Sequence, residues 1–107
     1  MQPRHIIKSR VTNDRKYPVT LIIEPWADEY PMPPGLTYEI RFEGPAGTSI
    51  EFASRDQELI VWGSPGSTFS LYQDHRLLRE CDIPAPPTAE ILVGKRTVPP
   101  GGVAVWR

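Results

Sequence analysis

Two runs decide the fold of this chain: Val19-Thr20-Leu21-Ile22-Ile23-Glu24, and then Leu36-Thr37-Tyr38-Glu39-Ile40-Arg41-Phe42-Glu43. In the second run every other residue is apolar, and the residues between are polar or charged. Such alternation with a period of two is typical of a β-strand that is buried on one face. The two runs therefore predict a pair of strands, joined by a loop over residues 25–35.

Further short segments have the same character and are separated by turn sequences rich in Gly, Pro, Asp and Ser. They are residues 5–11, 49–52, 59–62, 68–72 and 76–80. No segment shows the 3.6-residue apolar period of an amphipathic helix. We therefore predict an all-β fold, a small antiparallel β-sandwich or partly open barrel of about seven short strands.

The alternation also predicts which side chains face the core. The predicted core residues are Leu21, Ile23, Tyr38, Ile40, Phe42, Ile50, Phe52, Val61, Phe69 and Leu71. The run Leu59-Ile60-Val61-Trp62 is apolar on both faces, which indicates a central strand or one covered by a second layer. Asp74-His75 takes the place of a two-residue hairpin turn, and a type I′ turn there requires a positive φ at His75.

The composition changes after Cys81. Residues 82–87 read as an extended, polyproline-like linker, and two short apolar segments, 90–93 and 103–106, follow it. We predict a β-sandwich domain over residues 1–81 and a Pro/Gly-rich C-terminal extension over residues 82–107. That extension is either partly docked on the domain or a mobile tail that carries a binding peptide.

Charge and cysteine content narrow the class of protein. The net charge of the 107 residues is −1, which favours no polyanionic partner. The single cysteine, Cys81, excludes an intramolecular disulfide. The N-terminus lacks the apolar stretch of a secretory signal, and no run reaches the ~18 apolar residues of a membrane span. We expect a cytoplasmic protein with no membrane partner.

The residue types that carry chemistry are scattered. His5 and His75 are the only histidines and have no paired spacing with Cys or acidic residues, so we expect no metal and no cofactor. Ser64 and Ser67 flank a Pro-Gly turn but lack the Gly-x-Ser-x-Gly pattern of a nucleophile elbow. Cys81 is more typical of a small buried apolar residue than of a nucleophile. We expect no catalytic activity.

The best candidate site is the 25–35 segment, with Trp26, Asp28, Glu29 and Tyr30. Trp and Tyr are favoured anchors of protein interfaces, whereas the neighbouring acids would repel nucleic-acid phosphates. We therefore predict a non-catalytic protein-interaction or assembly module, which binds a protein partner or a second copy of itself. The alternative is a carbohydrate-binding module, in which the rings stack on sugars and the carboxylates bind hydroxyls. In a third interpretation, Trp26 is a lid on the core and Asp28 and Glu29 are solvated.

Overall fold

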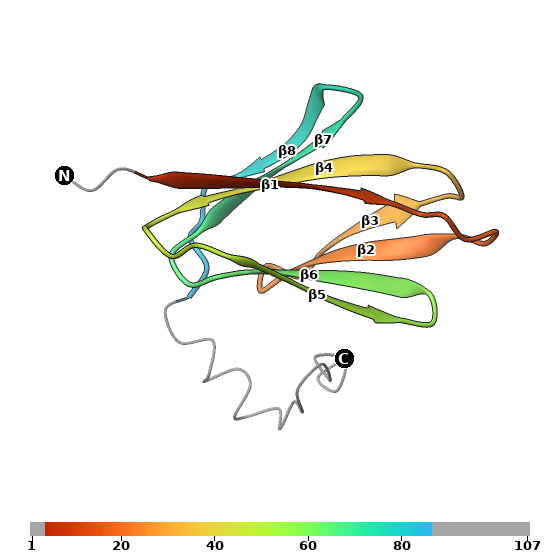
Figure 1. Cartoon of the computed structure of the whole chain (residues 1–107), viewed down its shortest axis with the longest axis horizontal. Helices are drawn as coiled ribbons and strands as arrows, with labels where there is room; N and C mark the ends of the chain where they lie inside the picture. The colour runs from red at the N-terminus through yellow and green to blue at the C-terminus, as the bar shows by residue number, and fades with distance from the viewer. Residues whose placement is uncertain (1–3, 87–107) are drawn as a thin grey trace.

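The computed structural model describes residues 4–86, which form eight β-strands in two sheets (Figure 1). The strands are β1 (His5–Thr12), β2 (Val19–Glu24), β3 (Asp28–Met32), β4 (Thr37–Gly44), β5 (Ile50–Arg55), β6 (Glu58–Gly63), β7 (Thr68–Gln73) and β8 (Arg76–Cys81). The first sheet has the order β1-β4-β7-β8 and the second the order β3-β2-β6-β5. The predicted all-β fold and small β-sandwich are confirmed.

One strand pair departs from the predicted antiparallel pattern. Five of the pairings among the described strands are antiparallel, but β2 and β6 run parallel. Parallel neighbours need a long crossover connection. Here the chain provides it by passing through β4, which lies in the other sheet, before it returns to the second sheet as β5 and β6.

The prediction of a continuous loop over residues 25–35 is wrong, because residues 28–32 form β3. This strand pairs antiparallel with β2, and Tyr30 lies opposite Leu21. Pro31 cannot donate a backbone hydrogen bond, and proline is therefore confined mainly to edge strands and strand ends. β3 is an edge strand of its sheet, so the proline is accommodated there.

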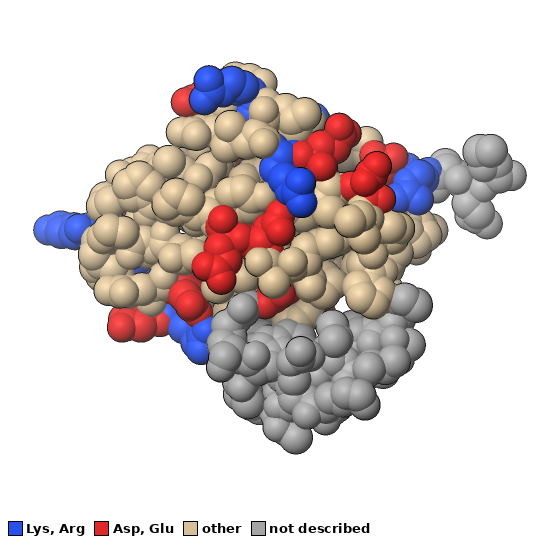
Figure 2. Space-filling view, turned by 180° about the vertical axis from the view of Figure 1, so that it is seen from behind, with Lys and Arg blue, Asp and Glu red and all other residues tan. Residues whose placement is uncertain are grey.

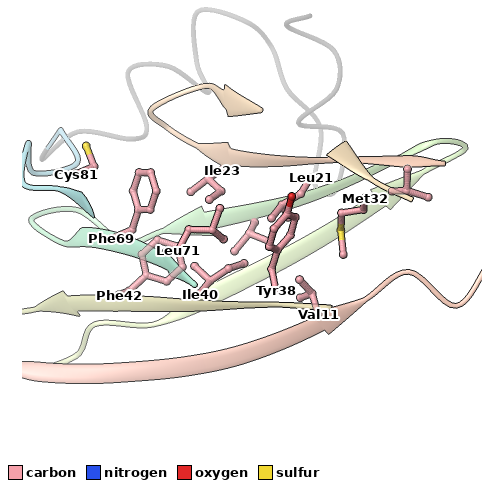
Figure 3. Packing of buried hydrophobic residues seen from close by; sticks show 12 residues of the cluster. Val11, Leu21, Ile23, Met32, Tyr38, Ile40, Phe42, Phe69, Leu71 and Cys81 are labelled. Carbon is pink, nitrogen blue, oxygen red and sulfur yellow. The ribbon is translucent and has the colours of Figure 1, made fainter. Parts of the chain in front are cut away.

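The core lies between the two sheets (Figure 3). Eight of the ten predicted core residues are buried, and Ile50 is partly buried against them. Phe52 is the exception, with 49% of its surface exposed. Its neighbour across the strands is the core residue Val61, so the predicted face is correct. Phe52 is exposed because β5 is an edge strand, with a neighbouring strand on one side only.

The hairpin turn between β7 and β8 has the predicted backbone conformation. Asp74 has a φ of 52° and His75 a φ of 65°. Positive φ at both central residues is the signature of a type I′ turn.

The chain after β8 folds back onto the sandwich. The Ala85 amide donates to the Ser67 carbonyl (2.8 Å), and the Gly66 amide donates to the Ala85 carbonyl (3.0 Å). Ala85 is 3% exposed. The start of the predicted C-terminal extension is thus docked on the β6–β7 turn, whereas residues 87–107 lie outside the described residues. No helix within residues 4–86 is long and apolar enough to cross a membrane.

Candidate functional site

The four predicted site residues do not form one surface. β2 and β3 are in register, so that Asp28 lies opposite Ile23, and Glu29 lies opposite Ile22. Residues opposite each other in an antiparallel pair point to the same face. Ile23 belongs to the core cluster. Asp28 and Tyr30 therefore lie on the inner side of β3, whereas Glu29 lies on the outer face of the second sheet.

Trp26 closes one end of the core. Its ring centroid lies 4.8 Å from that of Phe69 and 6.0 Å from that of Phe42, with which it is stacked. Its indole Nε1 donates a hydrogen bond of 2.6 Å to the backbone carbonyl of Ile83. The side chain is only partly buried. These contacts make Trp26 a cover for the core and fix the segment that follows β8 against it.

Asp28 joins the two sheets at the edge of the sandwich where β3 and β8 lie. Its Oδ2 accepts hydrogen bonds from the Tyr30 hydroxyl (3.0 Å) and from Arg79 Nε (3.0 Å). Arg79 belongs to β8 of the first sheet and Asp28 to β3 of the second. We call the surface formed by these two strands the β3–β8 edge. Seen from behind the view of Figure 1, acidic and basic side chains lie next to each other near the middle of the molecule (Figure 2).

The surroundings of Tyr30 change its titration. Burial of the phenol, helped by its hydrogen bond to the Asp28 carboxylate, raises the pKa of Tyr30 to about 12. The same carboxylate raises the pKa of the Arg79 guanidinium above its usual value, chiefly through the hydrogen bond between them. The Tyr30 ring also packs edge-on against Tyr38, at a centroid distance of 6.2 Å. At neutral pH, Tyr30 is a neutral hydrogen-bond donor whose hydroxyl is already engaged by Asp28.

The residues considered for metal binding and catalysis are far apart or have structural roles. His5 begins β1 opposite Gly44, and His75 lies in the turn at the other end of the first sheet. In the part of the chain that the structure describes, no three His, Cys, Asp or Glu residues gather in a way that could hold a metal ion. Cys81 is buried opposite Phe69. The Ser67 hydroxyl donates to the Ser64 carbonyl (2.6 Å) within the β6–β7 turn.

A feature that the sequence reasoning missed lies beside Asp28 and Arg79. Leu77 and Leu78 of β8 are 46% and 40% exposed. β8 is an edge strand, and a β-bulge at Leu71 and Tyr72 shifts its register against β7. The adjacent leucines of Arg76-Leu77-Leu78-Arg79-Glu80 were the available signal, since two neighbouring apolar residues cannot both face the core of a regular strand.

The comparisons with known proteins give no lead on function, because no family model, curated protein or solved structure matches this chain.

Proposed function

We propose that this chain is a non-catalytic protein-interaction module and that its contact surface is the β3–β8 edge. The observation that carries the proposal is the exposed leucine pair, Leu77 and Leu78, on an edge strand. An edge strand presents backbone donors and acceptors that an extended segment of another chain can pair with, and exposed apolar side chains add to that contact.

The other edge strands are less suited to pairing. β3 contains Pro31, which removes a backbone donor, and β1 carries Lys8 and Arg10. Proline and charged side chains on an edge are devices that prevent strand addition. β5 exposes Phe52 but also Glu51 and the ion pair of Arg55 with Glu58. β8 also carries charged side chains, Arg76, Arg79 and Glu80, but Arg79 is held by Asp28. The strand has no proline, and it carries two exposed leucines.

The 25–35 segment supports this surface. Asp28 holds Arg79, which is the next residue after Leu78, and so fixes the position of β8 relative to the second sheet. Trp26 and Tyr30 are engaged inside the molecule, so the leucines supply the apolar contact. The carbohydrate alternative stays a prediction. It gains no support from the site, because Asp28 and Glu29 lie on opposite faces of β3.

The proposal is tested with a native pull-down and a measurement of solution mass on the same variants. Leu78→Lys places a charge on the β8 edge, and Ile83→Lys is the matched control, since Ile83 is 65% exposed and lies outside β8. We expect a partner, or a dimer of the chain itself, that is lost in Leu78→Lys and kept in Ile83→Lys. Equal binding by both variants would contradict the proposed surface. Binding to a glycan panel, with no protein partner, would favour the carbohydrate alternative.

A further inference from the structure

The outer face of the second sheet is apolar at its centre. Ile22 of β2 and Ile60 of β6 lie side by side in register, and the neighbours of each along its own strand are core residues or, for Leu59, pack against the core. Since side chains alternate along a strand, both isoleucines point away from the core. Ala53 of β5 continues the row next to Ile60, and Trp62 lies two residues further along β6. We call this surface the outer apolar row.

The outer apolar row is buried. Ile22 and Ile60 are 1% and 0% exposed, although all eight described strands belong to the two facing sheets and none of them lies over this side (Figure 1). A sheet with one face on the core and the other in water shows a clean alternation of apolar and polar residues, whereas a sheet covered on both faces is apolar throughout. The central strands β2 and β6 have the apolar pattern of a sheet that is covered on both faces. They need a third layer that none of the described strands provides.

We propose that residues 87–107 of the same chain cover the outer apolar row. The first reason is the position at which the described chain ends. Ala85 is held by two backbone hydrogen bonds on the β6–β7 turn, which directly follows β6. A hollow of about 230 Å³, lined by Trp62, Gly63 and Pro65 among others, lies at the same end of the sheet.

The second reason is length. The 21 residues after Pro86 span up to about 70 Å when extended, and the six residues of β6 about 20 Å. The segment can therefore cross the whole sheet and turn back. A tether this short gives the segment an effective concentration in the millimolar range at the face. Docking within one chain is therefore favoured over docking of a second copy at ordinary protein concentrations.

The third reason is chemistry. The outward positions of the four strands include four acids and one arginine, namely Glu24, Glu29, Glu51, Glu58 and Arg55. Residues 87–107 contain three basic residues and one acid, and two apolar clusters, Ile91-Leu92-Val93 and Val103-Ala104-Val105-Trp106. An apolar strip with a basic excess matches an apolar row that is bordered by acids.

Limited trypsin digestion of the full chain, read by mass spectrometry, tests the proposal at Lys95 and Arg96. A synthetic peptide of residues 87–107 sets the rate for an unprotected segment. We expect cleavage after these two residues in the folded chain to be at least about tenfold slower than in the peptide, because cleavage must await local undocking. The protection should not depend on protein concentration.

Two variants and one control identify the face. Ile60→Ser should remove most of the protection from trypsin. The double variant Ile91→Ser with Val93→Ser should do the same, and it changes no residue of a described strand. Ile6→Ser is the matched control, because Ile6 is 57% exposed on β1 of the other sheet. Thermal melts show whether each variant is folded.

Three outcomes would overturn the proposal. In the first, the wild-type chain is cleaved as fast as the peptide. In the second, protection grows with protein concentration, which assigns the cover to a second copy. In the third, the double variant in the segment is as protected as the wild type. Each result is independent of whether Leu78→Lys loses a partner.

Discussion

Replacement of Trp26 by alanine separates a structural role of this residue from a role as an interface anchor. The side chain makes two ring contacts, with Phe42 and Phe69, and one hydrogen bond, to the Ile83 carbonyl. Each aromatic pair contributes about 0.5–1.5 kcal/mol beyond its buried area, and the hydrogen bond about 0.5–1.5 kcal/mol. Because the residue is only partly buried, we expect Trp26→Ala to cost about 3 kcal/mol, the lower end of the range for buried aromatic residues.

Trp26→Phe divides that loss. It keeps a ring against Phe69 but removes the indole donor, so we expect a smaller cost of about 1 kcal/mol. The control is Phe52→Ala, which also removes an aromatic ring but from a position that is 49% exposed. We expect the control to cost less than Trp26→Ala, because less buried surface is lost.

Urea unfolding followed by far-ultraviolet circular dichroism gives the free energy of unfolding of each variant. If Trp26→Ala lowered the free energy of unfolding by less than ~1 kcal/mol, and by no more than Phe52→Ala does, the reasoning from the ring contacts would be refuted. If the same variant also lost a protein partner, Trp26 would be an interface anchor as the sequence predicted, and the contact surface would have to move from β8 to residues 25–35.

Three further predictions follow from backbone geometry, packing and titration. His75→Gly should raise the melting temperature, because glycine adopts the φ of 65° without the strain of a Cβ; a lower melting temperature would contradict the turn assignment. Gly63→Ala should lower the free energy of unfolding by about 1–3 kcal/mol, because the new Cβ would lie 2.8 Å from a ring atom of Phe42; an unchanged urea midpoint would show that the ring moves aside. The Tyr30 contribution to stability should be complete below its usual pKa of 10.0 and be lost as the pH rises through about 12, since the unfolded chain releases that proton first. Burial raises the pKa of Tyr38 as well, so ultraviolet titration of the wild type and of Tyr30→Phe should differ by one tyrosine that ionises near pH 12. If the variant instead lacks a tyrosine that ionises in the usual range, the burial argument is contradicted.

The sequence alone was sufficient to predict those structural features that depend only on residues close together in the chain. The alternation of Leu36–Glu43 identifies the strand that becomes β4 and its inward face. The Asp74-His75 pair identifies the hairpin turn, because both residues tolerate positive φ better than most. The period-two pattern requires no knowledge of the partner strand, since the pleat itself puts successive side chains on opposite faces.

Tertiary structure alone decided the composition of the candidate site. Residues 28–32 carry acids and a proline, which disfavour a strand locally. The backbone hydrogen bonds to β2 make them one, and the register of that pairing sends Asp28 inward and Glu29 outward. Arg79 is 51 residues from Asp28 along the chain, so no local pattern connects them. The pairing exists because β3 and β8 end up at the same edge of the sandwich.

The order of the strands in the sheets also decided which of the apolar side chains on β5, β2 and β6 are covered. The alternation gives Phe52 the correct face, but whether that face is covered depends on β5 being an edge strand. Likewise, the apolar character of β2 and β6 on both faces is visible in the sequence, but their parallel pairing is what brings Ile22 beside Ile60. A strand's own residues determine which way its side chains point. Which side chains meet, and which stay exposed, depends on contacts between segments that are distant in sequence.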